Sequence, residues 1–153
     1  MKNTKIILLP LLILFFSLFA TAQTKTKIAA VKTPPPAAQA IKSSPAYAEI
    51  LLRKTERVAE LEDLLVEYTE DFPKVKELRF EIDLINQEMN RILAVNPAAA
   101  SKLTLALGKL MVRKVELETD VWNLLKQYTD DNSDVKQAKR KVEIFEAAIK
   151  EIL

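Results

Sequence analysis

The chain has 153 residues, among them 23 Lys and Arg, 21 Asp and Glu, seven Pro and a single Gly, and it contains neither Cys nor His. The lack of Cys and His excludes a thiol nucleophile, a disulfide, a Cys/His zinc site and an imidazole acid–base group. One glycine is too few for a glycine-rich phosphate loop, in which the backbone approaches the ligand at several positions. We therefore expect no cofactor.

Residues 1–22 have the pattern of a secretory signal peptide. Two lysines precede an apolar run over residues 6–19, and Ala20-Thr21-Ala22 fits a small-x-small cleavage site. The run is shorter than the roughly 20 residues that span a bilayer. We expect an exported protein, periplasmic or secreted, that begins at Gln23 and has no transmembrane segment after signal cleavage. Removal of the two leader lysines leaves 21 basic against 21 acidic residues, which gives no general case for nucleic-acid binding.

Residues 23–44 differ in composition from the rest of the chain. They contain Pro34-Pro35-Pro36, many Ala and Thr, and four lysines without an acidic residue. Such a segment has too little apolar surface to offset the entropy of ordering it. The composition predicts a disordered Pro/Ala/Lys-rich linker, and a weak contact of its lysines with an anionic envelope surface is an alternative role.

From Pro45 onward the pattern is helical, because apolar residues recur at alternating spacings of three and four. The spacing predicts an all-α fold of two tandem antiparallel helical hairpins, which are coiled-coil-like or close into a four-helix bundle. The hairpins span residues 45–95 and 96–153, and their helices span residues 45–69, 73–95, 97–129 and 133–153. The expected core stripes are Leu51, Val58, Leu61, Leu65 and Tyr68; Val75, Leu78, Ile82, Ile85, Met89 and Ile92; Leu103, Leu107, Leu110, Leu117, Val121, Leu124 and Tyr128; and Val135, Ala138, Val142, Phe145, Ile149 and Ile152.

The two predicted hairpins are copies of one sequence unit. After a shift of 60 residues, residues 49–93 lie over residues 109–153 with 12 identities in 45 positions and no gap. Heptad proteins show some self-similarity by chance, but a shared Tyr-Thr-acid-Asp run is harder to explain in that way. The shift predicts a duplicated helix–turn–helix unit.

Helix-capping residues mark the predicted boundaries. Ser44-Pro45 and Asn96-Pro97 each combine an N-cap residue with a proline suited to the first helical position. Pro73 cannot lie inside a continuing helix without the loss of a hydrogen bond, so the first hairpin turns before it. In the second copy, residues 130–133 are all good N-cap residues.

Each copy carries a hairpin-turn motif. The segments are Tyr68-Thr69-Glu70-Asp71-Phe72-Pro73-Lys74-Val75 and Tyr128-Thr129-Asp130-Asp131-Asn132-Ser133-Asp134-Val135. The motif resembles the hairpin turn in the periplasmic coiled-coil region of bacterial polysaccharide chain-length determinant and exopolysaccharide export proteins. The resemblance implies antiparallel helix pairing in an envelope setting. It implies no activity. The flanking transmembrane helices of that family, and the kinase domain that some of its members carry, are not found in this sequence, and Phe72 stands where the family often has His. The motif residues that we single out are Tyr68, Thr69, Asp71, Pro73 and Val75, with Tyr128, Thr129, Asp131 and Val135.

Part of the second turn matches the first half of a calcium-binding loop. Asp130, Asn132 and Asp134 follow the D-x-N-x-D spacing, but Val135 stands at the sixth position, where such loops have Gly. Helix N-capping explains the same three residues. We therefore assign no metal ligand here.

Carboxylates spaced four residues apart suggest a metal site or an acid–base pair. The pairs are Glu56/Glu60 and Glu116/Asp120, each on a predicted helix. No His accompanies them, and arginines lie nearby in the sequence, so exposed ion pairs are the expected reading. We assign no catalytic and no cofactor-binding residue.

Two features are candidates for binding a partner. Lys136, Lys139, Arg140 and Lys141 form a basic cluster at the start of the last predicted helix, which suits an acidic partner or a polyanion, although a solvated helix face has the same composition. Trp122 aligns with a glutamate in the first copy, so the repeat does not require it as core. It either packs between the hairpins or anchors a partner.

Three functional hypotheses follow from the sequence. The first is a non-enzymatic exported protein that mediates protein–protein interaction or scaffolding in the bacterial envelope, with a protein partner or a second copy bound through helix faces. The second is a periplasmic holdase-type chaperone, which spare apolar surface would favour. The third is an enzyme that uses carboxylates alone, but the sequence offers no nucleophile–base pair for it. We therefore expect no enzymatic activity.

Overall fold

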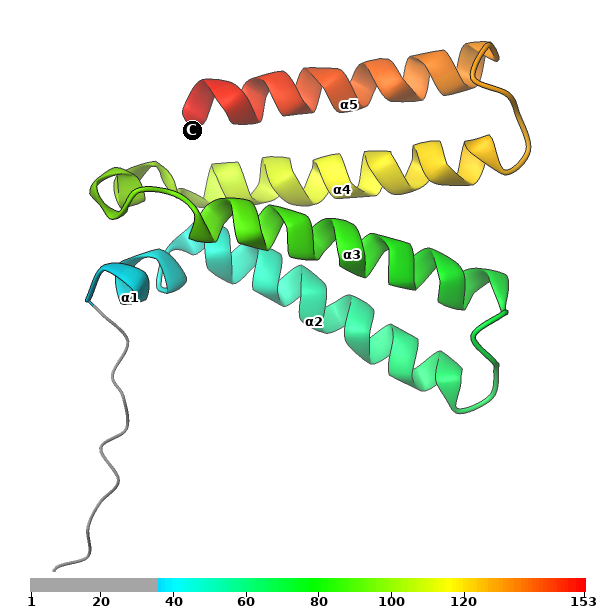
Figure 1. Ribbon diagram of the computed structural model, residues 1–153, viewed down its shortest axis with the longest axis horizontal. Coiled ribbons are helices and arrows are strands. Elements are labelled where there is room, and N and C mark those ends of the chain that lie inside the picture. Colours follow the sequence, from blue (N-terminus) through cyan, green and yellow to red (C-terminus); the bar gives the residue numbers. More distant parts are fainter. Residues whose placement is uncertain (1–35) are drawn as a thin grey trace, which may run out of the picture. The chain divides into compact units, whose positions relative to one another are not determined.

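The structure, a computed structural model, describes residues 36–153 and the side chains from Gln39 onward. All regular structure in this part of the chain is helical (Figure 1), which confirms the predicted all-α class. The predicted signal peptide (1–22) and residues 23–35 of the predicted linker lie outside the described residues. The elements are α1 (Pro36–Lys42), α2 (Pro45–Leu65), α3 (Pro73–Leu93), the 3₁₀ helix η1 (Pro97–Lys102), α4 (Leu105–Leu125) and α5 (Ser133–Ile152).

The predicted helix starts at 45, 73 and 133 are confirmed. Side-chain caps explain the first and the last, whereas α3 starts with Pro73 in its first turn and has no side-chain cap. The Ser44 side chain accepts a hydrogen bond from the Tyr47 N–H at 3.3 Å, and Pro45 occupies the first turn of α2. Asn132 caps α5 by accepting from the Asp134 N–H at 2.8 Å. Each cap satisfies a backbone donor that the helix itself leaves unpaired.

The predicted continuous helix over residues 97–129 is wrong. Residues 97–102 form η1, the chain then bends at Leu103 (ψ 58°), and α4 begins at Leu105. The bend has two causes: Leu103 is buried in the core, and the Thr104 hydroxyl accepts from the Leu107 N–H, which starts a new helix there. Helix α4 therefore has the same length as α2 and α3, which is 21 residues.

The predicted disorder of the linker is wrong over its last part. Residues 36–42 form α1, and Ile41 on this helix is only 4 % exposed, because it joins the main core cluster. Alanine-rich sequence favours a helix, and the burial of Ile41 together with the contacts of α1 with η1 and α3 holds this short segment against the core.

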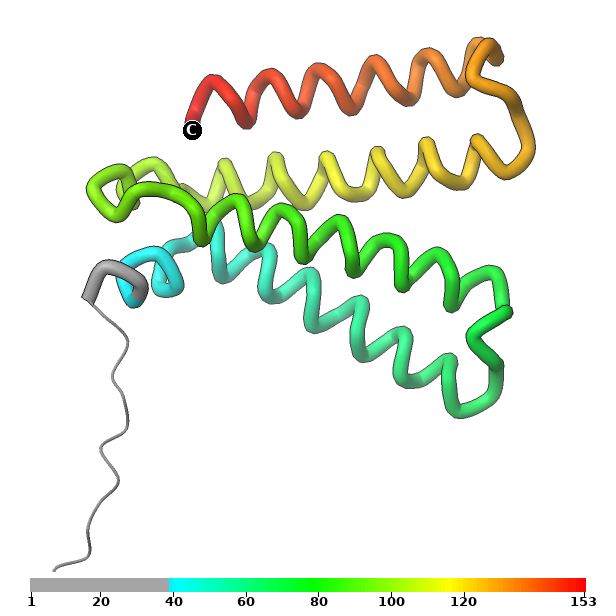
Figure 2. Tube along the Cα trace, viewed as in Figure 1, coloured from blue at the N-terminus to red at the C-terminus, as the bar shows by residue number. Residues whose placement is uncertain are grey.

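The internal repeat is visible in the fold. Helices α2 and α4 begin 60 residues apart, as do α3 and α5. The turn hydrogen bonds repeat as well: the Tyr68 N–H donates to Leu64 O at 2.9 Å, and the Tyr128 N–H donates to Leu124 O at 2.9 Å. Figure 2 shows both turns at the same end of the helix pairs. We call α2 and α3 hairpin 1, and α4 and α5 hairpin 2.

Helix α4 is the central helix. It contacts α2, α3 and α5, whereas α5 packs mainly against α4 (Figure 1). Hairpin 2 is therefore stacked on hairpin 1 through α4, and α5 does not close a four-helix core with α2 and α3. Met111 and Val115 of α4 are buried although they lie outside the predicted stripe, because α4 is covered on two sides. Among the described helices, none has the length and apolar composition needed to cross a membrane.

The predicted stripes of α3 and α5 are confirmed, but that of α2 is wrong in part. Val75, Leu78, Val135 and Ile149 are fully or almost fully buried. On α2, by contrast, Leu51 is 42 % exposed and Val58 is 36 % exposed, while Ala46, Ile50 and Leu61 are buried. The inner face of α2 also carries two arginines, so hydrophobic spacing alone selects the wrong face over part of its length.

The single glycine of the chain lies where α2 crosses α4. A Cβ atom placed on Gly108 would lie 2.9 Å from the Cα of Ala46 and 2.9 Å from the Cβ of Glu49. Ala46 is fully buried there, and its N–H donates to Leu103 O at 3.2 Å. The two helices meet backbone to backbone, and a side chain at Gly108 would keep them apart.

Gly108→Ala is expected to lower the free energy of unfolding by about 1–2 kcal/mol. Overpacking usually costs about 1–3 kcal/mol, and we expect about 2–3 kcal/mol here because the crowded atoms include the Ala46 backbone, which cannot turn aside. Alanine regains only about 1 kcal/mol of helix propensity. Urea unfolding followed by circular dichroism measures the change.

The matched control is Ala48→Gly, at the exposed repeat-equivalent position of α2, which should also destabilise, by about 1 kcal/mol through propensity alone. A Gly108→Ala variant at least as stable as the wild type would contradict the close crossing.

Candidate functional site

The hairpin-turn residues lie at the tips of the two hairpins. Val75 and Val135 are buried beneath the turns, and Pro73 occupies the first turn of α3. The Tyr68 ring stacks on the Phe72 ring with centroids 4.1 Å apart. The remaining motif residues, Thr69, Asp71, Tyr128, Thr129 and Asp131, are exposed. The motif therefore builds the turns, and its exposed residues do not converge on one site.

Both tips carry the same pair of ion bridges. Lys76 Nζ lies 2.9 Å from Asp71, and its equivalent Lys136 lies 3.5 Å from Asp131. Arg79 binds Glu70, and its equivalent Lys139 lies 2.8 Å from Asp130. The Arg79 hydrogen bond lowers the pKa of the Glu70 carboxyl, and Lys76 lowers that of Asp71 in the same way.

The ion bridges at the tip of hairpin 2 engage part of the basic cluster on α5. Lys136 and Lys139 are occupied by the tip aspartates, and Arg140 donates to Glu143 at 2.8 Å. Lys141 is the one member of the cluster without an ion-pair partner among residues 36–153. The four side chains therefore do not form a free anion site.

Glu81 of α3 is the centre of a buried ion-pair network between helices. It accepts from Arg53 Nε at 3.1 Å, lies 2.9 Å from Arg53 Nη2, and lies 3.4 Å from Arg57 Nε. Arg53 also contacts α4, because its Nη2 lies 3.0 Å from Glu116. One carboxylate thus joins α2 to α3 and, through Arg53, to α4.

Lys114 of α4 is the centre of a second network. Its Nζ lies 2.7 Å from Glu88 on α3, 3.2 Å from Glu118 on α4 and 3.6 Å from Glu146 on α5. Arg91 of α3 also reaches Glu146, at 3.0 Å. Burial alone would lower the pKa of Lys114, but the hydrogen bond to Glu88 and the charges of Glu88 and Glu118 outweigh it and raise the pKa. The network joins α3, α4 and α5.

Of the four helical carboxylates considered for chemistry, Glu56, Glu60 and Glu116 lie in ion pairs, whereas Asp120 is exposed and has no ion-pair partner among the described residues. Glu60 binds Arg57, and Glu116 binds Arg53 and Arg113. In the second turn, Asn132 serves as the helix cap while Asp130 binds Lys139. In the part of the chain that the structure describes, no group of three acidic side chains is placed to hold a metal ion.

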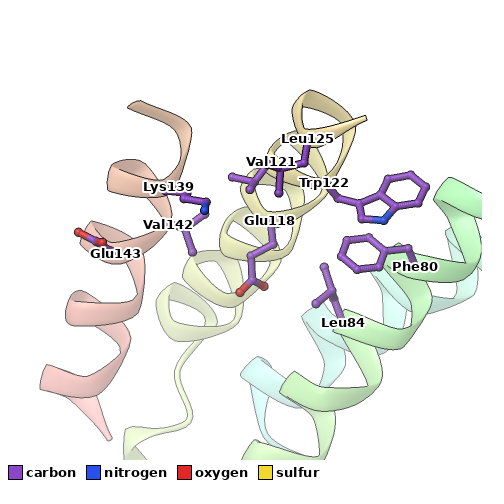
Figure 3. A pocket seen from close by; sticks show the side chains of 9 residues that line it. All are labelled: Phe80, Leu84, Glu118, Val121, Trp122, Leu125, Lys139, Val142 and Glu143. Carbon is purple, nitrogen blue, oxygen red and sulfur yellow. The ribbon is translucent and has the colours of Figure 1, made fainter. Parts of the chain in front are cut away.

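An apolar groove runs along α4 between α3 and α5, and we call it the α4 groove (Figure 3). Its volume is about 440 Å³. In Figure 3 the α3 and α5 side chains lie on opposite sides of the α4 side chains. The apolar lining residues are Phe80 and Leu84 of α3, Val121, Trp122 and Leu125 of α4, and Val142 of α5.

Trp122 links the two hairpins and lines the α4 groove at the same time. Its ring stacks on Phe80 with centroids 4.9 Å apart and planes at 10°, and Lys126 Nζ lies 3.2 Å from the ring centroid. The stacked pair and the cation over it place Trp122 between the hairpins. Of the two sequence interpretations, inter-hairpin packing is the one that the contacts bear out.

Three charged residues border the α4 groove: Glu118, Lys139 and Glu143. Burial raises the pKa of the Glu118 carboxyl, although its ion pair with Lys114 opposes the shift.

Sequence reasoning missed the groove and both networks. A lysine that interrupts an apolar stripe is a sign of a buried ion pair. Lys54 and Lys114 both interrupt the predicted stripes, and Lys114 is the one at the centre of a network. The groove had no local signal, because its residues come from three helices and only folding brings them together.

Comparison with protein-family models, with curated proteins and with solved structures found no match for this chain. The function is therefore argued from the geometry.

Lys114→Met should lower the free energy of unfolding by about 3–5 kcal/mol, because it leaves the buried Glu88 carboxylate without its amine. Lys54→Met at the repeat-equivalent position is the matched control and should change stability by about 0.5 kcal/mol or less, since Lys54 has no ion-pair partner among the described residues. Thermal and urea unfolding measure both. Equal effects at the two positions would show that the Lys114 network does not hold the hairpins together.

The free energy of unfolding should fall as the pH drops below about 4.5. Two carboxylates that link helices have pKa values lowered from 4.5. Burial opposes both shifts, but hydrogen bonds from Lys74 and Asn123 to Glu77, and from Arg91 to Glu146, outweigh it. Because both pKa values are lower in the folded state, their contribution is complete above the unfolded value and is lost as the pH falls through the folded one.

The measurement is urea unfolding at a series of pH values from about 7 to about 3. The double variant Glu77→Gln/Glu146→Gln should show a shallower dependence over the acidic range. If the free energy of unfolding of that variant depended on pH as steeply as that of the wild type, Glu77 and Glu146 would not be the groups responsible.

Proposed function

We propose that this chain is an exported, non-enzymatic helical-hairpin protein that binds a protein partner in the bacterial envelope. The observation that carries the proposal is the α4 groove, in which six apolar side chains from three helices line one hollow on the surface. A groove with an apolar floor and charged residues at its border suits a helix or an extended segment of a partner protein.

The charged residues support a binding role rather than catalysis. Glu81, Glu88 and Glu116 at the hairpin interface lie in ion pairs with Arg53, Arg57 and Lys114, and these pairs join different helices. Carboxylates held in that way are not free to exchange protons with a substrate. The tips are likewise neutralised by their own bridges.

Export is proposed from the leader pattern of residues 1–22 and from the hairpin-turn motif. The lysine-flanked apolar run and the Ala20-Thr21-Ala22 site are typical of a cleaved secretory signal. The motif resembles the turn of chain-length determinant proteins, and what we take from it is the envelope setting and the antiparallel hairpin.

A holdase-type chaperone is the second candidate function. Exposed apolar side chains on α2 favour it, since Leu51 and Leu52 are 42 % and 57 % exposed. Suppression of aggregation of a chemically unfolded model protein, followed by light scattering, would support it. Protection that survives Leu125→Asp in the α4 groove but not Leu52→Asp would place client binding on α2.

The partner-binding proposal is tested by photo-crosslinking in the source organism. A photoreactive amino acid at Leu125 in the α4 groove should crosslink a protein of defined mass in the envelope fraction, and Val142→Asp should abolish the band. The control position is Val66, which is 84 % exposed and lies outside the groove.

N-terminal sequencing of the recovered chain should give Gln23. Equal crosslinking at Leu125 and Val66 would contradict a groove-specific partner, and an uncleaved chain in the cytoplasm would contradict export.

A further inference from the structure

The stacking of hairpin 2 on hairpin 1 leaves one whole side of α2 open. Helix α4 contacts hairpin 1 through the face that carries Gly108, Met111, Val115 and Trp122. The repeat-equivalent face of α2, 60 residues earlier, is exposed along its length. We call it the outer face of α2. Its residues are Ala48, Leu51, Leu52, Thr55, Val58, Ala59 and Glu62.

The opposite end of the stack is open in a matching way. The side of hairpin 1 that receives α4 includes Ala46, Arg53 and Phe80. The repeat-equivalent side of hairpin 2 is exposed, and we call it the outer face of hairpin 2. Its residues are Ala106, Arg113, Gln137, Arg140, Lys141 and Ile144. Ile144 is 55 % exposed. A hollow of about 430 Å³ between α4 and α5 is lined in part by Gln137 and Lys141 of the same face.

We propose that copies of this chain associate head to tail, with the outer face of α2 of one copy against the outer face of hairpin 2 of the next. The contact would repeat the way in which hairpin 2 stacks on hairpin 1. Such an interface joins two different surfaces, so each copy keeps one free face and the association can continue. The proposal rests on the proposed interaction function, names a second copy as a partner, and uses surfaces other than the α4 groove.

One inter-hairpin ion pair would be conserved in this contact. Within the chain, Arg53 of hairpin 1 binds Glu116 of α4 at 3.0 Å. The repeat equivalents are Arg113 on the outer face of hairpin 2 and Glu56 beside the outer face of α2. Both residue types are identical, so the same bridge would form between copies once Arg113 exchanges its partner Glu116 for Glu56 of the next copy.

A second position changes its chemistry but stays complementary. Phe80 stacks on Trp122 within the chain. The equivalents are Arg140 and Glu62, which are oppositely charged. An aromatic stack inside the chain would thus become an ion pair between copies, in which Arg140 exchanges its exposed partner Glu143 for Glu62.

At a third position the two partners of a hydrogen bond are exchanged. Glu77 accepts from the Asn123 amide at 2.8 Å within the chain. The equivalents are Gln137 and Asp63, so the amide and the carboxylate change sides and the hydrogen bond is kept. Net charge agrees with these pairs: residues 46–95 have 12 acidic and seven basic residues, net −5, whereas residues 96–153 have nine acidic and ten basic residues, net +1.

Two substitutions make the contact between copies weaker than the one inside the chain. Ala48 stands in place of Gly108, so the helices cannot approach as closely. Ala148 stands in place of Glu88, so Lys54 has no counterpart of the Glu88–Lys114 bridge. A reversible, concentration-dependent association follows from these losses.

The decisive experiment mixes two variants of the exported chain, each with one face disabled. Leu52→Asp disables the outer face of α2, and Ile144→Asp disables the outer face of hairpin 2. Both side chains are more than half exposed, so both variants should fold, which circular dichroism checks. Multi-angle light scattering should show wild-type masses that rise with concentration beyond two chains, single chains for each variant alone, and two-chain complexes for the mixture.

The control is Leu93→Asp, a 39 % exposed leucine outside both faces, which should associate like the wild type. A charge exchange provides an independent test: Glu62→Arg and Arg140→Glu should each raise the dissociation constant about tenfold, because like charges then face each other, and the double variant should restore it.

Three results would overturn the proposal. They are a wild-type chain that stays single at every concentration, Ile144→Asp complexes as stable as the wild type, which would indicate an α2–α2 contact, and charge variants without rescue. None of these bears on the photo-crosslink at Leu125, so failure of head-to-tail association and failure of the proposed partner binding are read separately.

Discussion

The structure depends on one close crossing, that of α2 and α4 at Gly108. Because the helices meet backbone to backbone there, the rest of α4 lies near enough to hairpin 1 for the Arg53–Glu116 bridge at 3.0 Å and the Trp122–Phe80 stack. A side chain at this position would push α4 outward and lengthen these contacts together. The crossing therefore decides whether two similar hairpins behave as one unit.

The central place of α4 explains the surfaces on which the functional proposals depend. A helix covered by hairpin 1 on one side and by α5 on the other leaves α5 and α3 apart, and the α4 groove lies between them. Buried carboxylates also tie the helices together in this arrangement, since Glu81 binds Arg53 of α2 and Glu88 binds Lys114 of α4. The same stacking leaves apolar and charged side chains exposed at both ends, where a bundle closed on itself would have covered them.

The sequence predicts the repeat, the hairpin turns and the stripes of α3 and α5 because these follow from local spacing and caps. It fails for α2 because the inner face of that helix carries Arg53 and Arg57, whose ion pairs with Glu81 exist only after folding. The same reasoning missed α1, which is held by tertiary contacts including the buried Ile41, and the bend at Leu103, where burial of that residue and the Thr104 cap end one helix and start the next. The groove around Trp122 could not be predicted, because its residues come from helices that spacing cannot place side by side. The basic cluster on α5 was predicted as a partner site, and the tip aspartates occupy half of it.

The crossing itself can be observed with one selective label. The chain has a single glycine, so isotope labelling of glycine marks Gly108 alone. Nuclear Overhauser spectroscopy should then show strong cross-peaks from the Gly108 α protons to protons of Ala46 and Glu49 on α2. Cross-peaks confined to the neighbouring residues of α4 would show that the helices do not meet there, and would contradict the account.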